Sequence, residues 1–257
     1  MRKIAITGSA GGMGVATRAV LEAQGHRVIG VDVRDAEVIA DLSTAIGRDE
    51  MIRAVTAASD GALDGLVAAA GIASDGGNED LVISINYFGA VAAVEGLRSL
   101  LAKGTQPSAI AISSNSTSTQ MGIPRTAVEA CLAGDEAGAR AAAAEAPMCG
   151  YPASKLALAH WVRAQAVSPD WIGAGIRLNA IAPGLIATPM TEGGVEFVLA
   201  LGDTYPVPIG RAGTSAEIAG LLAYLLSPAA AFFVGSVIYM DGGTDAVLRT
   251  RDWPAAR

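Results

Sequence analysis

The sequence predicts one α/β domain, a doubly wound parallel sheet of about seven strands with helices on both faces. Short apolar strands alternate with helical stretches along nearly the whole chain. The strands are continuous apolar runs, which is typical of parallel strands that are buried on both faces. The 257 residues contain no linker that would divide them, so we expect a single domain.

A glycine-rich turn joins the first strand, residues 3–7, to an alanine-rich helix at about 15–24. The second strand, 27–32, follows, and the three elements make a βαβ unit. Glycines in such a turn let the backbone approach a pyrophosphate, which rests on the helix N-terminus. A turn of small residues that only packs helix on strand is the alternative. The candidate phosphate-binding residues are Gly8, Gly12, Met13 and Gly14.

Asp32 ends the second strand and can accept hydrogen bonds from the hydroxyls of an adenosine ribose. Its carboxylate would repel a 2′-phosphate, and Ser9, Ala10 and Gly11 carry no basic side chain. The expected cofactor is therefore NAD and not NADP. Arg34 argues for NADP, because an arginine can hold a phosphate. It could equally stack on adenine or face solvent, so we do not count it as evidence for NADP.

The third strand, residues 37–41, follows the second after only four residues. A parallel crossover normally needs about a dozen residues or more. The usual helix between these strands must therefore be missing or reduced to one turn. Asp41 and Leu42 then lie at a strand end, where they could line an adenine pocket.

An amphipathic helix at 44–58 leads to a buried strand at 65–71. Ala70 and Gly71 close that strand at its C-terminal end, where ligands bind in such sheets. Both residues are therefore candidates for cofactor contact.

A long helix at about 80–101 carries Asn86 inside an apolar stretch, where an asparagine is either a satisfied core residue or a functional one. Ser114 lies at the C-terminal end of the next strand, 109–113. Residues 117–147 fit the alternating pattern poorly, and we expect an inserted helix–loop–helix there. Its helices are predicted at 125–132 and 136–145.

Tyr151 and Lys155 are four residues apart in a helix that should begin near Gly150, because Pro152 is tolerated only in a first turn. Both side chains then project from one face. A phenol titrates near ~10 and cannot act as a base at neutral pH unless a positive charge lowers its pKa. Two ordinary side chains on a helix surface are the alternative, since this spacing is common by chance.

The C-terminal part contains a strand at 175–180, a turn at 183–188, a helix at 215–226 and a last strand at 236–240. The segment between turn and helix is rich in glycine and proline with apolar residues in between. A long segment after a strand's C-terminal end is a candidate substrate lid, here about 188–213.

Composition restricts the partners. The net charge of −7 argues against nucleic acid or an anionic membrane, and two cysteines with two histidines argue against a metal site. Residues 218–240 carry no charge and could span a membrane, but Ser227 and Pro228 interrupt them, so we expect a helix, a turn and a strand. No secretory signal precedes the first strand, which favours a cytoplasmic protein.

This order of features resembles the short-chain dehydrogenase/reductase family over nearly the whole chain, and that family has a Rossmann-type sheet. The residues that carry the resemblance are Thr7-Gly8-xxx-Gly12-x-Gly14, Asp32, Ala70-Gly71, Asn86, Ile112-Ser113-Ser114, Tyr151-xxx-Lys155, Asn179 and Pro183-Gly184-xxx-Thr188. Two departures are Ala68-Ala69, where most members have two asparagines, and the long insertion before Tyr151.

The resemblance implies a catalytic tetrad of Asn86, Ser114, Tyr151 and Lys155. Ser114 would hold the substrate oxygen, Tyr151 would transfer the proton, Lys155 would lower its pKa, and Asn86 would position a water. The implied cofactor-binding residues are Gly8, Gly12, Met13, Gly14, Asp32, Asp41, Leu42, Ala70, Gly71, Tyr151, Lys155, Pro183, Gly184, Ile186 and Thr188.

Within the family, the chain is most similar to the bacterial 3α-hydroxysteroid dehydrogenase/carbonyl reductases. The similar features are the short link from Asp32 to Asp41, Asn86-Tyr87-Phe88-Gly89-Ala90, the insertion and Asp241-Gly242-Gly243-x-Asp245. This implies a hydrophobic alcohol or ketone as substrate. An aromatic alcohol of the coniferyl type, or a role as an NAD(H)-binding sensor or scaffold, is the alternative.

The family usually assembles through the helices that carry Asn86 and Tyr151. The insertion would cover that surface, so we expect a homodimer through the last helix and strand.

Overall fold

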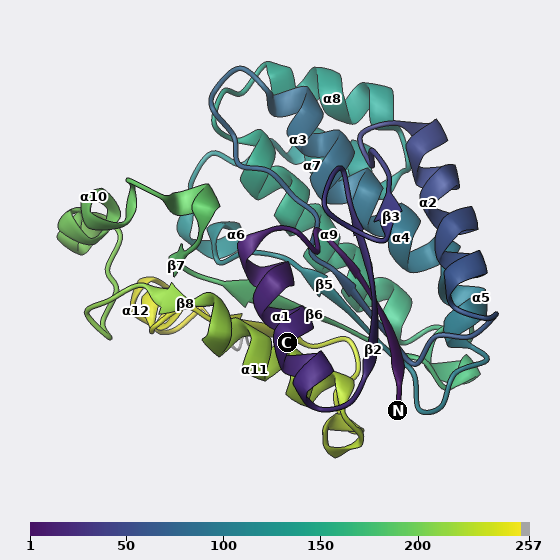
Figure 1. Cartoon of the computed structure of the whole chain (residues 1–257). Coiled ribbons are helices and arrows are strands. Elements are labelled where there is room, and N and C mark those ends of the chain that lie inside the picture. The colour runs from purple at the N-terminus through teal and green to yellow at the C-terminus, as the bar shows by residue number, and fades with distance from the viewer. Residues whose placement is uncertain (253–257) are drawn as a thin grey trace.

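The computed structural model describes residues 1–252 and contains a seven-stranded parallel sheet in one domain, as the sequence predicts (Figure 1). The strand order is β3-β2-β1-β4-β5-β6-β9. The order reverses between β1 and β4, and ligands bind at such a switch point beyond the carboxyl ends of the strands. The strands are β1 (Lys3–Thr7), β2 (Arg27–Asp32), β3 (Val38–Ile39), β4 (Gly65–Ala68), β5 (Ser108–Ile112), β6 (Arg177–Pro183) and β9 (Val237–Met240).

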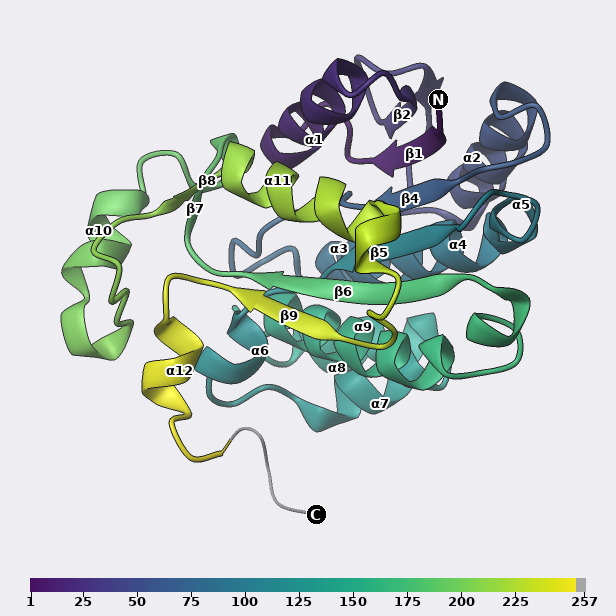
Figure 2. The same ribbon diagram turned by 90° about the horizontal axis from the view of Figure 1, so that it is seen from below.

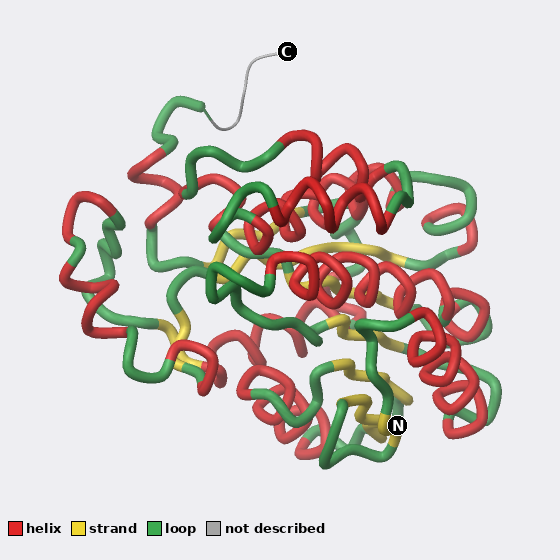
Figure 3. The backbone as a smooth tube through the Cα atoms, turned by 90° about the horizontal axis from the view of Figure 1, so that it is seen from above, coloured by secondary structure: helices red, strands yellow, loops and turns green. Residues whose placement is uncertain are grey.

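Helices lie on both faces of the sheet, and α10 (Val195–Ala200) and α12 (Thr244–Leu248) lie beyond its end (Figures 2 and 3). On one face, α1 (Gly12–Ala23) packs beside α11 (Ser215–Leu226). Ile4 and Ile6 point into this core, whereas Ala5 between them belongs to the core on the other face. This alternation is the period of two that a strand imposes on its side chains.

The opposite face carries α2 (Ala45–Ala58), α4 (Ala90–Gly96) and α9 (Gly150–Ala166). The predicted helix at 80–101 is not continuous. It consists of α3 (Glu79–Ile83), a π-helical turn (Ser84–Gly89), α4 and α5 (Arg98–Leu101), so Asn86 lies in the π-helical turn. Such turns interrupt the regular α-helical hydrogen bonds and are frequent at functional sites.

No helix separates β2 from β3, as the short link predicts, but β3 has two residues instead of five. Glu37 does not extend the strand. Its carboxylate accepts the backbone N–H of Gly30 at 2.8 Å and pairs with Arg18. The side chain thus satisfies a strand N–H, and pairing with β2 begins only at Val38.

Other boundaries differ from the predictions. Helix α1 begins at Gly12, three residues earlier, and β4 ends at Ala68. Strand β6 begins after a left-handed Gly175 and runs to Pro183, because its last four residues pair with β9. The sequence interpretation missed the elements β7 (Ile186–Ala187), β8 (Gly213–Thr214), α10 (Val195–Ala200) and α12 (Thr244–Leu248).

The insertion contains a short α6 (Ser116–Thr119), then α7 (Arg125–Leu132) and α8 (Glu136–Ala144), so its two predicted helices are confirmed. These two helices pack on α3 and α9 and bury side chains in the main core. The buried residues are Ala127, Val128, Cys131, Ala139 and Ala143.

Arg48, 7% exposed, ties the insertion to the rest of the fold. It forms two hydrogen bonds of 2.7 Å with the carboxylate of Glu136 at the start of α8. It also donates to the carbonyls of Leu42 at 2.8 Å and of Ser84 at 2.9 Å. One guanidinium therefore connects the end of the third strand, the π-helical turn and the insertion.

The uncharged run at 218–240 is α11, a turn and β9, which confirms the sequence interpretation. Within residues 1–252, only Glu79–Leu101 is long and apolar enough to cross a membrane, and 56% of its most apolar window is buried in the fold.

Candidate active site

A cleft of about 350 Å³ lies at the switch point between β1 and β4. Its walls are the glycine-rich turn, the end of β2, the segment after β3, the end of β4 and the base of the predicted lid. The predicted cofactor residues that line it are Gly8, Gly12, Met13, Gly14, Asp32, Asp41, Leu42, Ala70, Gly71 and Thr188.

Two glycines of the glycine-rich turn, Gly8 and Gly14, leave no room for a side chain. Gly8 has φ +71°, and a Cβ built on it would lie 2.7 Å from the backbone nitrogen of Ala70. A Cβ on Gly14 would lie 2.1 Å from the carbonyl oxygen of Gly8. Backbone N–H groups and the start of α1 therefore face the cleft directly, which suits a pyrophosphate.

Asp32 ends β2 and lies beside the glycine-rich turn. Its Oδ2 accepts the N–H of Ala10 at 2.9 Å, and its Oδ1 accepts the N–H of Val33 at 2.8 Å. Each carboxylate oxygen keeps a further lone pair for a ribose hydroxyl. Arg34 is exposed and lines the same cleft.

Helix α9 begins at Gly150, as predicted, and brings Tyr151 and Lys155 to one face. The Lys155 Nζ lies 5.6 Å from the centre of the Tyr151 ring and donates to the carbonyl of Ile112 at 2.8 Å. The side chain of Ser114 forms a hydrogen bond with the Tyr151 phenol. The structure thus brings Ser114, Tyr151 and Lys155 together at the ends of β5 and α9.

Burial governs the charges of this cluster. It raises the pKa of the Tyr151 phenol, and the hydrogen bond with Ser114 acts in the opposite direction. It lowers the pKa of Lys155 from 10.5 to about 8. Loss of solvation of the phenolate is the larger effect on the Tyr151 pKa in this structure. The role of Lys155 toward that pKa stays a prediction.

Asn86 and Lys155 both lie beside Gly71, which has no side chain to separate them. A Cβ on Gly71 would lie 3.0 Å from Asn86 Oδ1 and 3.5 Å from Lys155 Nζ. Both ends of the Asn86 amide bond to the backbone of Ile72. Oδ1 accepts the Ile72 N–H at 2.9 Å, and Nδ2 donates to the Ile72 carbonyl at 3.0 Å. Asn86 therefore fixes the wall of the cleft, and its role toward water stays a prediction.

The remaining predicted residues flank the cleft without lining it. Gly184 donates its N–H to the carbonyl of Met240 at 3.1 Å, and the carbonyl of Pro183 accepts the N–H of Asn115 at 2.9 Å. Ile186 pairs with Gly213 in the small β7–β8 sheet. The Ile186–Gly213 pairing holds the two ends of the predicted lid together.

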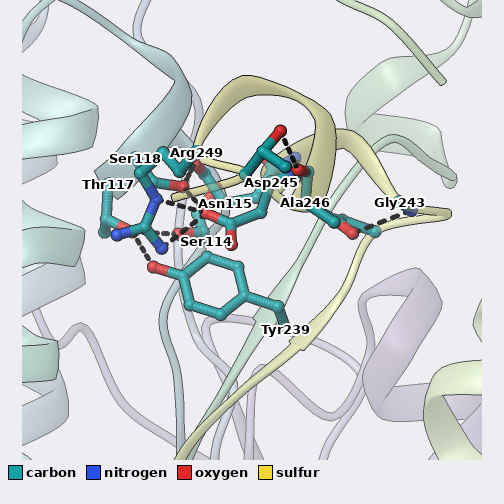
Figure 4. A network of polar contacts seen from close by, with 11 residues as sticks. Ser114, Asn115, Thr117, Ser118, Tyr239, Gly243, Asp245, Ala246 and Arg249 are labelled. Carbon is teal, nitrogen blue, oxygen red and sulfur yellow. Dashed lines mark hydrogen bonds and ion pairs between the residues drawn. The ribbon is translucent and has the colours of Figure 1, made fainter. Parts of the chain in front are cut away.

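A polar network behind Ser114 was not predicted as part of the site (Figure 4). Asn115 and the phenol of Tyr205, a lid residue, exchange hydrogen bonds of 2.9 and 3.1 Å. Asn115 Nδ2 also lies 3.4 Å from Asp241 Oδ2. The only sequence signal was the Asp241-Gly242-Gly243-x-Asp245 motif, which gave no partner for either aspartate.

The same network continues into α12. Asp245 accepts a hydrogen bond from Ser118 of α6 and pairs with Arg249 at 2.6 Å. Arg249 lies over the ring of Tyr239, whose hydroxyl is 3.1 Å from Thr117 Oγ1. The last helix is thus attached to the segment that follows Ser114.

Residues 137–245 match the family model described as enoyl-(acyl carrier protein) reductase. The chain is 43% identical to a 3-alpha-hydroxysteroid dehydrogenase/carbonyl reductase of Comamonas testosteroni, over 97% of this chain and 98% of that protein. It is 31% identical to a cis-4-hydroxycyclohexanecarboxylate dehydrogenase of Sinomonas cyclohexanicum, over 96% and 97% of the two chains.

Solved structures agree with this similarity. A 3-alpha-hydroxysteroid dehydrogenase from Pseudomonas sp. B-0831 complexed with NADH has a TM-score of 0.88 and 40% identity, covering 98% of this chain and all of that one. An RhlG/NADP complex of Pseudomonas aeruginosa has a TM-score of 0.74 and 25% identity, covering 95% and 96%. Structures similar to this chain therefore include complexes with either nicotinamide cofactor.

Proposed function

Because the chain belongs to the short-chain dehydrogenase/reductase family of oxidoreductases, we propose that it interconverts a hydrophobic secondary alcohol and its ketone with NAD(H). A 3α-hydroxysteroid is the substrate class that we favour, since the similar proteins of Comamonas testosteroni and Pseudomonas are named for it. The observation that carries the proposal is the Ser114–Tyr151–Lys155 cluster beside a cleft with a glycine-rich wall.

NAD is the cofactor that we favour over NADP. The carboxylate of Asp32 lies where the adenosine ribose would bind, and it would repel a 2′-phosphate. Arg34 lines the cleft but is exposed, so any charge that it contributes is screened by solvent. Glycines 8, 12 and 14 would hold the pyrophosphate, and Thr188 with the Ile186 backbone would hold the carboxamide.

The chain supplies orientation and proton transfer, and the bound nicotinamide supplies or accepts the hydride. Ser114 would hold the substrate oxygen next to the Tyr151 hydroxyl, with which it shares a hydrogen bond. Burial keeps Tyr151 as a phenol, so it can donate a proton to the oxygen of a ketone during reduction. In oxidation, Tyr151 must act as the base, and the positive charges of Lys155 and of oxidised nicotinamide would favour its phenolate.

The lid, residues 188–213, would cover the substrate. It carries an apolar group that includes Met190, 49% exposed, and Phe197, 68% exposed. Helix α10 has no buried residue, so its apolar side chains are available to a ligand. This supports a hydrophobic substrate. The apolar lid residues that we assign to the substrate are Met190, Val195, Phe197, Val198 and Leu199.

We further propose a homodimer through α11 and β9. Strand β9 is the edge of the sheet, and Phe232 beside it is fully exposed. Helix α7 packs on α9, and α8 packs on α3 and the π-helical turn, so the insertion covers the helices that carry Tyr151 and Asn86. Both cysteines are free thiols, which suits a reducing cytoplasm.

Replacing Tyr151 with phenylalanine tests the role of the phenol. Turnover should fall by about 10²-fold or more, because general acid–base catalysis contributes about 10²–10⁴-fold. The affinity for NADH should change little, since the ring remains. Tyr224→Phe on α11 is the matched control. Near-full activity of Tyr151→Phe would show that the assignment of roles is wrong.

The function itself is tested by NADH formation with a 3α-hydroxysteroid, with NADP in a parallel assay. Turnover with NAD alone would support the substrate class and the role of Asp32. Equal turnover with NADP would contradict the role of Asp32. NAD binding without steroid turnover would favour an aromatic or other hydrophobic alcohol, and then a sensor.

A further inference from the structure

Helix α9, which carries Tyr151 and Lys155, begins without a cap of its own. Its N-cap residue, Cys149, makes no side-chain hydrogen bond. Pro152 has no N–H to satisfy, and the N–H of Ala153 already bonds to the carbonyl of Cys149 at 3.1 Å. The free donors of the first turn are therefore those of Gly150 and Tyr151.

Glu79, the first residue of α3, supplies the missing acceptor from a distant part of the chain. Its Oε2 accepts the N–H of Gly150 at 2.8 Å, and its Oε1 accepts the N–H of Met148 at 2.7 Å. Ser74 also donates to Oε1. The side chain is 3% exposed, so a buried carboxylate lies against the positive end of the α9 dipole.

Only a carboxylate satisfies this arrangement. The two backbone N–H groups point at different oxygens of Glu79, so a glutamine would turn its NH₂ group toward one of them. Met148 adopts φ +65°, a left-handed conformation that non-glycine residues rarely adopt and that needs external support. The Glu79 contact holds this residue two positions before the helix starts.

The approach of α3 to α9 is also tight. A Cβ on Gly150 would lie 2.4 Å from Glu79 Oε2 and 3.2 Å from the Cα of Glu79. Glycine at this position therefore lets the carboxylate reach the helix start. The place of Tyr151, the next residue, depends on this contact.

We propose that Glu79 is a positioning residue that holds the Tyr151 phenol at the correct distance from Ser114. The proposal rests on the proposed role of Tyr151 in proton transfer. Glu79 touches neither the cleft nor the phenol, and it acts by fixing the first turn of α9. A displacement of about 1 Å at a reacting group can lower a rate by about 10²-fold.

The same residue links the helix to the wall of the cofactor cleft. Asn86 holds Ile72 by two hydrogen bonds, and Glu79 holds Ser74 two residues later. The loop after β4 is therefore attached to α9 through Glu79. The cofactor side and the proton-transfer side of the site are thus positioned by one set of side-chain hydrogen bonds.

Replacement of Glu79 by glutamine is the first test, with kcat, KM for alcohol and cofactor, and NADH affinity as readouts. We expect kcat to fall at least tenfold at a temperature where the variant is folded, with NADH affinity within twofold of the parent. Asp135→Ala is the control, because it removes the side-chain cap of α8 at Gly138 and touches neither the cleft nor Tyr151. It should lower the melting temperature and leave kcat unchanged.

A kcat within twofold of the parent, or a parallel loss of NADH affinity and kcat, would overturn the proposal. Gly150→Ala gives a second test that keeps the carboxylate, and it decides the matter if Glu79→Gln does not fold. Its new Cβ should displace the helix start and lower kcat to a similar extent. Combined with Glu79→Gln, it should add little, because both variants break one contact.

Tyr151→Phe separates this proposal from the proposed function. Loss of activity in Tyr151→Phe with normal kcat in Glu79→Gln and Gly150→Ala would refute only the positioning role. Retained activity in Tyr151→Phe would refute the proposed function first, and the positioning role with it.

Discussion

The buried ammonium group of Lys155 lowers the stability of the folded protein at neutral pH. Burial lowers its pKa from 10.5 to about 8, so its folded environment disfavours the charged form. Between pH 8 and 10.5 the unfolded chain holds the proton that the folded chain has released. Stability from this group therefore rises with pH in that window, and below pH 8 the full cost of a buried charge remains.

Lys155→Met should for this reason be more stable than the parent at pH 7 and inactive. The gain is expected to approach about 3 kcal/mol, since one pKa unit corresponds to about 1.4 kcal/mol. It should shrink as the pH rises from 8 toward 10.5. Denaturant unfolding at several pH values measures the difference, and a gain that is independent of pH would contradict the argument.

Sequence reasoning was accurate where residue spacing alone decides the outcome. The four-residue separation of Tyr151 and Lys155 puts both on one face of α9, and Pro152 marks the first turn. It did not include the effect of burial, which raises the Tyr151 pKa, because burial depends on the packing of distant segments. Glu79 was missed since an acidic residue at the start of a helix is common and its partner lies 71 positions away.

At the scale of elements, the proposed lid extends away from the body of the protein around α10 (Figure 1). Helix α10 buries no side chain, and Tyr205 after it provides a polar contact to the body of the protein. Its phenol bonds to Asn115, next to Ser114, and is close enough to Tyr151 for the two phenols to interact electrostatically. The Tyr205–Asn115 pair therefore attaches the proposed lid to the protein beside Ser114.

Tyr205→Phe should raise KM for the alcohol several-fold and leave NADH affinity unchanged. The hydroxyl forms two hydrogen bonds with Asn115, and their loss weakens the attachment of the proposed lid without changing the shape of the ring. Hydrogen exchange of residues 189–210 should become faster. Tyr224→Phe serves as the comparison, and unchanged exchange in the lid would show that the pair does not hold it.

Elements with strong local signals were predicted well. Helix α11 has the boundaries that its capping residues Thr214 and Glu217 indicate, and α7 matches its predicted range. The break in the 80–101 helix and the short β3 were not predicted. Both depend on tertiary contacts, the first on Asn86 reaching Ile72 and the second on Glu37 reaching Gly30.

At the scale of the whole molecule, the α11–β9 face is the surface that a second copy would cover. Phe232 is fully exposed there, and Tyr224 on α11 is 44% exposed. Phe232→Asp should therefore shift a homodimer toward monomers. Light scattering coupled to size exclusion measures the mass, with Phe197→Asp in the lid as control. A dimer that persists in Phe232→Asp, or a tetramer built on the Tyr151 helices, would contradict this assembly.

Arg48 has a consequence for engineering the family scaffold. The insertion departs from the usual family pattern and could be taken for a detachable module. Removing α8 would delete Glu136 and leave the Arg48 guanidinium buried against Leu42 and Ser84 without its counter-ion. An unpaired buried charge costs about 3–5 kcal/mol. A shortened variant would therefore need a second change at Arg48, and the two segments must be exchanged between relatives as one unit.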